Sequence, residues 1–126
     1  MNTILLHALF GVGGGLGALA RFWLTLRVTH RFPLSTLLVN VLGCFLLGVG
    51  VGWLPIPNGW AEQDMRRLVH GFCGGFTTFS SFAYQSLDLH RRFSVLHAAA
   101  NVVVSLALCL LALWAGLYLG QRMPAA

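Results

Sequence analysis

Four long apolar stretches constrain this chain more than any other feature. They cover residues 3–26, 34–54, 68–87 and 95–119. A helix that crosses the hydrocarbon core of a bilayer takes about 20 residues, and each stretch is long enough for one. Arg21 is the one charged residue inside them. The pattern predicts an all-α integral membrane protein with four transmembrane helices, organised as a single membrane domain over residues 1–126.

The composition excludes the water-soluble classes of protein. Hydrophobic residues make up 57% of the chain and charged residues 9%, whereas a soluble domain carries about 25% charged residues. The basic residues are eight arginines, scattered singly or in pairs, so the net charge of +5 does not form a nucleic-acid-binding patch. The three cysteines, Cys44, Cys73 and Cys109, lie in apolar runs without a CxxC pair, which indicates packing rather than a disulfide or zinc site.

The arginines also bear on topology. With four spans, both termini and the second link share one side of the membrane. That side carries three arginines and the opposite side carries four. Cytoplasmic loops normally hold an excess of Lys and Arg, so this weak bias predicts insertion in both orientations and an antiparallel, dual-topology homodimer. Glycines spaced four residues apart in every span, such as Gly48 and Gly52, predict close helix packing.

Polar residues inside the spans are the candidate functional residues, because such groups are costly in lipid unless they face a partner or a hydrated path. Asn40 lies near the start of the second span. In the fourth span, His97, Asn101, Ser105 and Cys109 recur every four residues and form one polar or small stripe. Interhelical hydrogen bonding explains Asn101 and Ser105 equally well, whereas for Asn40 we favour a functional role. No acidic residue lies in a span, which disfavours proton relay through a membrane carboxylate.

The third span contains features that weaken a helix. Gly74 and Gly75 are followed by the β-branched residues Thr77 and Thr78. A broken helix is tolerated in a membrane where its freed backbone groups are buried in protein or line a cavity. Freed carbonyl oxygens suit an alkali cation. The sequence therefore predicts that the third helix is broken at mid-membrane.

Phenylalanines accompany this predicted break at helical spacing. They are Phe72, Phe76, Phe79 and Phe82. The edge of an aromatic ring is the positive end of its quadrupole. Ring edges beside amide and hydroxyl donors indicate a path for an anion that contains no fixed cation.

Four blocks of residues, spread over nearly the whole length, match one known family. They are Gly13–Ala18 leading to Arg21-Phe22, Ser35–Gly43 continuing to Gly48, Gly71–Phe82, and Asn101–Ser105. The third block, GFCGGFTTFSSF, is the most specific. The chain resembles the small fluoride channels of the Fluc or CrcB family. The resemblance implies a multi-pass protein of the cell inner membrane, an antiparallel homodimer and passive export of fluoride.

The resemblance also implies roles for individual residues along the fluoride path. Asn40 would be an amide donor to fluoride, and Phe79 and Phe82 would present ring edges to it. Three further polar residues would belong to the path, and one arginine would lie near an aqueous vestibule. These are Ser81, Asn101 and Ser105 for the path and Arg21 for the vestibule.

The resemblance further implies a structural sodium ion. Backbone carbonyls of Gly74 and Thr77 would bind it, shared between the broken third helices of two chains. Two other functions stay open on the residues alone. A small multidrug antiporter also has four helices, although its proton coupling would need a glutamate in the first span, and none is there. A non-transporting membrane scaffold would need only the glycine spacings.

Overall fold

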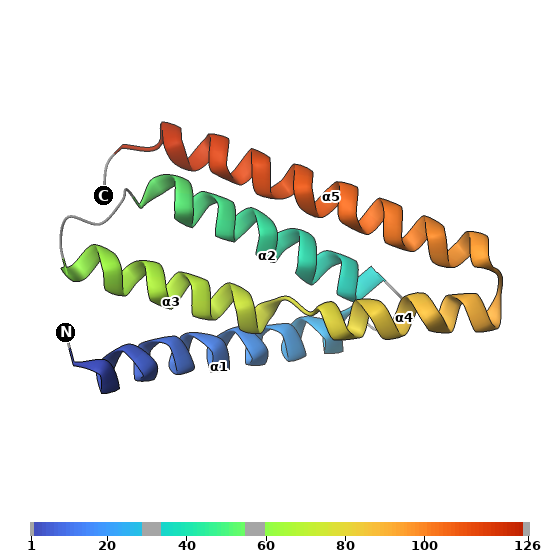
Figure 1. Cartoon of the computed structure of the whole chain (residues 1–126), viewed down its shortest axis with the longest axis horizontal. Coiled ribbons are helices and arrows are strands. Elements are labelled where there is room, and N and C mark those ends of the chain that lie inside the picture. Colours follow the sequence, from blue (N-terminus) through green and yellow to red (C-terminus); the bar gives the residue numbers. More distant parts are fainter. Residues whose placement is uncertain (1, 29–33, 55–59, 125–126) are drawn as a thin grey trace.

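The computed structural model describes residues 2–28, 34–54 and 60–124, with the backbone alone for residues 60–63. These ranges form five α-helices: α1 (Thr3–Arg27), α2 (Leu34–Trp53), α3 (Trp60–Phe76), α4 (Phe79–Arg92) and α5 (Val95–Arg122). Figure 1 shows that α1, α2 and α5 each run along the long axis, and that α3 and α4 together make one further traverse. Two segments with sequence features of interest lie outside the described residues. They contain Pro33, Pro55 and Pro57, a residue type that commonly marks helix boundaries, and Arg31, one of the four arginines counted on the side opposite the termini.

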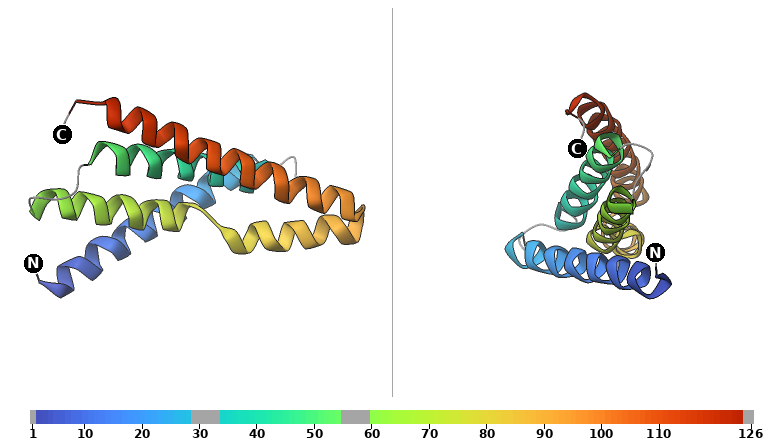
Figure 2. Two further views of the ribbon diagram at one scale, coloured as in Figure 1. Left: turned by 45° about the horizontal axis from the view of Figure 1, so that its top comes forward. Right: turned by 90° about the vertical axis from the view of Figure 1, so that its left-hand side faces the viewer.

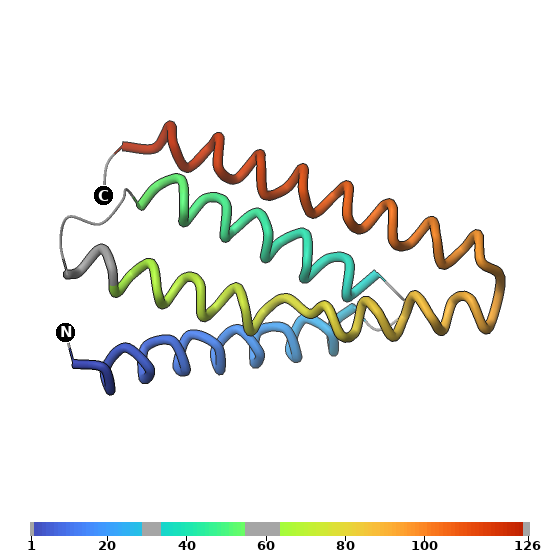
Figure 3. The backbone as a smooth tube through the Cα atoms, viewed as in Figure 1, coloured from blue at the N-terminus to red at the C-terminus, as the bar shows by residue number. Residues whose placement is uncertain are grey.

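Three of the described helices, α1, α2 and α5, are long and apolar enough to cross a membrane by length and composition. The all-helical architecture agrees with the sequence prediction, and so do the starts of these three helices. The third predicted span, residues 68–87, is divided between α3 and α4, with Thr77 and Thr78 outside both helices. In Figure 3 this junction is the extended part of the tube between α3 and α4.

The helices run beyond the predicted apolar stretches. α3 begins at Trp60 rather than at residue 68, and α4 continues to Arg92 rather than to residue 87. The added turns are polar and hold ion pairs at helical spacing, between Asp64 and Arg67 at 3.5 Å and between Asp88 and Arg92 at 3.1 Å. The end of an apolar run is therefore not the end of a helix, because charged residues continue the helix outside the hydrocarbon.

Glycines hold the helices together in two parallel pairs. In the pair α1–α3, Gly13 lies against the backbone of Leu68 and Phe72, and Gly71 against that of Phe10. In the pair α2–α5, the seam is formed by glycines of both helices, namely Gly48, Gly52, Gly116 and Gly120. Figure 2 shows α5 beside α2, and α1 crossing α3. Backbones approach this closely only where no Cβ intervenes, so these seams fix the axial register of the helices.

Replacing Gly71 by alanine should destabilise the protein. The added Cβ would lie 2.6 Å from the carbonyl oxygen of Phe10, a backbone atom that is not free to move aside. Overpacking of this kind costs about 1–3 kcal/mol. The matched control is Gly11→Ala, because a Cβ on Gly11 meets nothing within 4 Å and alanine gains about 1 kcal/mol of helix propensity over glycine. Thermal unfolding in detergent measures both, and equal midpoints for the two variants would contradict the packing.

Candidate functional site

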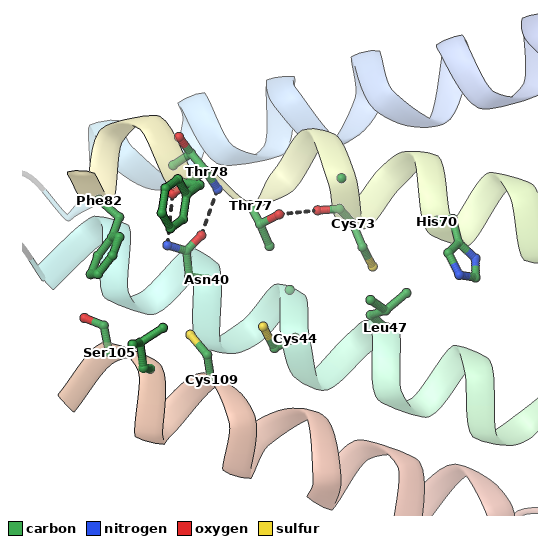
Figure 4. A pocket seen from close by; sticks show the side chains of 14 residues that line it. Asn40, Cys44, Leu47, His70, Cys73, Thr77, Thr78, Phe82, Ser105 and Cys109 are labelled. Carbon is green, nitrogen blue, oxygen red and sulfur yellow. Dashed lines mark hydrogen bonds between the residues drawn. The ribbon is translucent and has the colours of Figure 1, made fainter. Parts of the chain in front are cut away.

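The junction between α3 and α4 is held by the side chain of Asn40 on α2. Its Oδ1 accepts a hydrogen bond of 2.8 Å from the backbone N–H of Thr78, and its Nδ2 donates one of 3.1 Å to the carbonyl of Thr78. Figure 4 shows this pair of bonds as two dashed lines. A carboxamide carries one acceptor and one donor group in the arrangement of a peptide unit. Asn40, on a neighbouring helix, therefore provides Thr78 with the hydrogen-bond acceptor and donor that the interrupted helix does not provide.

The same bonds release two carbonyls from the helical ladder. In a continuous helix the N–H of Thr78 would bond to the carbonyl of Gly74, four residues earlier, but it bonds to Asn40 instead. The N–H of Ser81 would likewise bond to the carbonyl of Thr77, but it bonds to Thr78 Oγ1 at 3.2 Å, as at the N-cap of α4. Gly74 and Thr77 thus lose their regular backbone donors.

A cavity of about 350 Å³ lies along this junction, between α2, α3, the start of α4 and α5. We call it the first cavity. Six of the residues predicted for the site line it: Asn40, Gly74, Thr77, Phe79, Phe82 and Ser105. In the described part of the chain, no arginine, aspartate or glutamate lines this cavity. Its polar groups are therefore amide, hydroxyl, thiol and backbone groups and the imidazole of His70.

The two phenylalanines of the predicted path differ in environment. Their ring centroids are 5.6 Å apart and the ring planes are inclined by 51°. Phe82 is 9% exposed and packs inside the chain, whereas Phe79 is 76% exposed. The ring of Phe79 is therefore open to lipid or to another protein surface rather than covered by its own chain. Within one chain, Phe82 alone has the fixed surroundings of a cavity wall.

A series of hydrogen bonds joins α4 to α5 beside the first cavity. Ser105 Oγ donates to Asn101 Oδ1 at 3.4 Å, and Asn101 Nδ2 donates to Ser86 Oγ at 3.0 Å. Ser86 Oγ in turn donates to the carbonyl of Phe82 at 2.8 Å. Asn101 does not line the first cavity itself but is bonded to Ser105, which does. Ser86 was not predicted as a site residue from the sequence. Its position four residues after Phe82 was the signal that could have indicated it.

Arg21 and Ser81 lie elsewhere. Both line a second cavity of about 300 Å³ between α1, α2 and α4, with Thr36 and Gln85. Within the described residues, Arg21 Nε and Gln85 Oε1 are buried without a hydrogen-bond partner, so the second cavity suits water or an anion. Ser81 faces this cavity rather than the first, which separates it from the other residues predicted for the path. Thr78 lines both cavities.

The fold and the site together define a multi-pass helical membrane protein with an uncharged polar cavity beside an interrupted helix. The chain belongs to the family described as CrcB-like protein, Camphor Resistance (CrcB), which it matches over residues 8–117. This finding confirms the family resemblance of the sequence blocks.

Relatives named fluoride-specific ion channel FluC are similar over most of their length. The one from Azobacteroides pseudotrichonymphae is 39% identical over 112 residues, covering 82% of this chain and 89% of the relative. That from Methylobacterium radiotolerans is 42% identical over 111 residues, covering 83% and 77%. That from Geobacter sulfurreducens is 38% identical over 128 residues, covering 98% and 100%.

Replacing Asn40 by leucine should destabilise the fold. The N–H and carbonyl of Thr78 would lose both bonds to Asn40, and a buried group left unsatisfied costs about 1–3 kcal/mol. The matched control is Asn101→Leu, also a part-buried asparagine with two hydrogen bonds. Its partners are rotatable hydroxyls, and Ser86 keeps its bond to Phe82, so this variant should lose less stability. Thermal unfolding in detergent decides, and an Asn40→Leu midpoint at or above that of Asn101→Leu would refute the role of the Asn40 bonds.

Proposed function

We propose that this chain is a fluoride-selective channel that lets fluoride leave the cell passively, and that it is not an enzyme. Its relatives carry the name of that activity, and the observation that carries the proposal is the uncharged first cavity. Conduction needs binding that is favourable enough for entry and weak enough for exit. Neutral donors and ring edges meet this need, whereas a fixed cation would hold a small, strongly hydrated anion too tightly.

The proposed path combines residues of both cavities. Arg21 would attract the anion from water at the second cavity, outside the first cavity whose donors are neutral, and Asn40 would pass it to the first cavity. The Nδ2 group of Asn40 has two N–H bonds, of which one is donated to Thr78, so one remains for fluoride. Beyond Asn40, the path runs past Phe79 and Phe82. The hydroxyl of Ser105, connected to Asn101, gives it a polar wall on α5.

The working unit of the proposal is an antiparallel, dual-topology homodimer. Two features of the chain support a partner over the first cavity. Phe79 is 76% exposed at its edge, and a Cβ placed on Gly74 would meet nothing within 4 Å. A second copy on this face would cover Phe79 and place the junctions of two third spans together at mid-membrane. The near-equal arginine distribution favours opposed copies.

A structural sodium ion fits the donors at this face. The carbonyls of Gly74 and Thr77 are hard, neutral oxygens released from the helical ladder by the bonds to Asn40 and Thr78 Oγ1. The bound ion would supply a positive charge that offsets the convergence of carbonyl dipoles from two chains. Asn40 and Thr78 act on this site only by keeping those carbonyls free.

Fluoride efflux from liposomes tests the proposed function. The purified wild-type protein should release fluoride rapidly, with little chloride in the matched chloride assay. Phe79→Ile and Phe82→Ile should each reduce fluoride efflux at least about tenfold, a barrier increase of about 1.4 kcal/mol, because they remove ring edges and keep an apolar side chain. The control is Phe72→Ile, on α3 outside the first cavity.

Two results would refute the channel. If folded wild-type protein released no fluoride, the scaffold function would be favoured. If the protein instead transported a drug in exchange for protons, the antiporter function would be favoured. Equal losses of fluoride efflux in Phe72→Ile and Phe82→Ile would contradict the proposed role of the ring edges in the path.

Arginine substitutions test the dual topology. Gln121→Arg and Met123→Arg with Arg91→Gln would place five arginines on the side of the termini against three. Val28→Arg with His90→Arg would instead place six on the opposite side against three. Each set should fix one orientation, so cells that express either alone should become fluoride-sensitive. Co-expression should restore tolerance, and full tolerance with one set alone would contradict the antiparallel dimer.

A further inference from the structure

The three cysteines of the chain all line the first cavity. Cys44 comes from α2, Cys73 from α3 and Cys109 from α5. The sequence indicates only separate packing residues, since the three positions lie far apart along the chain. Figure 4 shows the sulfur atoms of Cys44 and Cys109 side by side between α2 and α5. The proposed conduction of fluoride uses none of these thiols.

Cys44 and Cys109 form the candidate pair. Their side chains line the same cavity wall and lie next to each other between α2 and α5. The seam between α2 and α5 fixes this arrangement, because the backbone at Gly48 lies against the backbone at Gly116. Cys44 is four residues before Gly48, and Cys109 is seven residues before Gly116, so the two cysteines lie within about one helical turn of each other along the parallel pair. The two sulfur atoms are therefore held by rigid backbones.

The number of thiols limits which metal ion suits the pair. Structural zinc sites are four-coordinate, and the described residues contain no group of three or more His, Cys, Asp or Glu side chains that could hold a metal ion. Two thiolates suit a soft ion that accepts two ligands in line. The cavity is also poor in charge, so a complex with no net charge is favoured over a charged one.

We propose that Cys44 and Cys109 form a two-coordinate binding site for the mercuric ion, Hg²⁺. Two S–H bonds break, two S–Hg bonds form and two protons leave to water, with no electron transfer. The resulting bis-thiolate complex is neutral. The corresponding complex of Ag⁺ would carry one negative charge within the membrane, so Ag⁺ should be held less tightly.

The position of the site has a functional consequence that rests on the proposed function. Cys109 lies one turn from Ser105 on α5, and Cys44 lies one turn from Asn40 on α2. An ion that bridges the two sulfur atoms would occupy the cavity next to the proposed fluoride path. Mercuric ion should therefore obstruct fluoride efflux.

Metal binding by the purified, reduced protein tests the site directly. Wild-type protein is treated with mercuric chloride, then washed with an excess of a monothiol, and the mercury retained per chain is measured by elemental mass spectrometry. Two tethered ligands gain about 10²–10⁴ in affinity over one, so wild-type protein should retain one Hg²⁺ per chain. Cys44→Ser and Cys109→Ser should each retain at least about tenfold less, and the matched control Cys73→Ser should retain as much as the wild type.

Three outcomes would overturn the site. They are retention by Cys44→Ser equal to that of the wild type, loss of retention in Cys73→Ser, and a mercury-linked dimer on a non-reducing gel, which would place the ligands in two different chains. Retention of Zn²⁺ or Ag⁺ equal to that of Hg²⁺ would overturn the proposed selectivity.

The efflux assay then separates the two proposals. Mercuric ion should stop fluoride efflux by wild-type and Cys73→Ser protein and leave Cys44→Ser protein active. Efflux that continues with Hg²⁺ bound would refute the obstruction, whereas an absence of fluoride efflux in every sample would refute the channel and leave the metal-binding result intact.

Discussion

The pair of hydrogen bonds between Asn40 and Thr78 is the interaction on which the rest of the site depends. Lipid offers no water to an unpaired backbone N–H or carbonyl, and each such group costs several kcal/mol in the bilayer. An interruption between α3 and α4 is stable only where another group replaces the missing helical bonds. Asn40 does so from α2 with both ends of one carboxamide. The free carbonyl of Gly74 follows from that substitution, and the free carbonyl of Thr77 follows from the bond between Ser81 N–H and Thr78 Oγ1 at the same junction.

The glycine seams hold Asn40 in the position from which it bonds to Thr78. Asn40 reaches Thr78 only if α2 holds its position relative to α3, and Gly43 contributes by lying against the methyl group of Thr77. The parallel pairs α1–α3 and α2–α5 are set by backbone contacts at glycine, which leave little freedom for sliding. Packing residues that carry no chemistry thus determine the geometry of the residues that do. The polar side chains of the site have fixed positions because the apolar seams around them are rigid.

The helices could be predicted from the sequence because their burial in lipid requires long apolar runs. Their polar ends could not, since residues such as Asp64 and Arg92 continue a helix without any apolar signal. Gly74 and Gly75 are helical, although they were expected to weaken the helix, and the non-helical residues are Thr77 and Thr78. Gly75 lies against the backbone of Gly14, so this glycine serves close packing.

The site was predictable to the extent that lipid makes polar residues conspicuous. Asn40, Phe82 and Ser105 do meet in one cavity. Ser81 and Gln85 share a different cavity, because the N-terminal turns of α4 have one face toward α1 and another toward α5. The rotation of α4 about its axis decides which side each residue faces, and Thr78, the N-cap of that helix, is held by its bonds to Asn40. A carboxamide fixed by two bonds cannot rotate, so the remaining N–H of Asn40 has a set direction. In the proposed channel, an anion therefore need not order this donor.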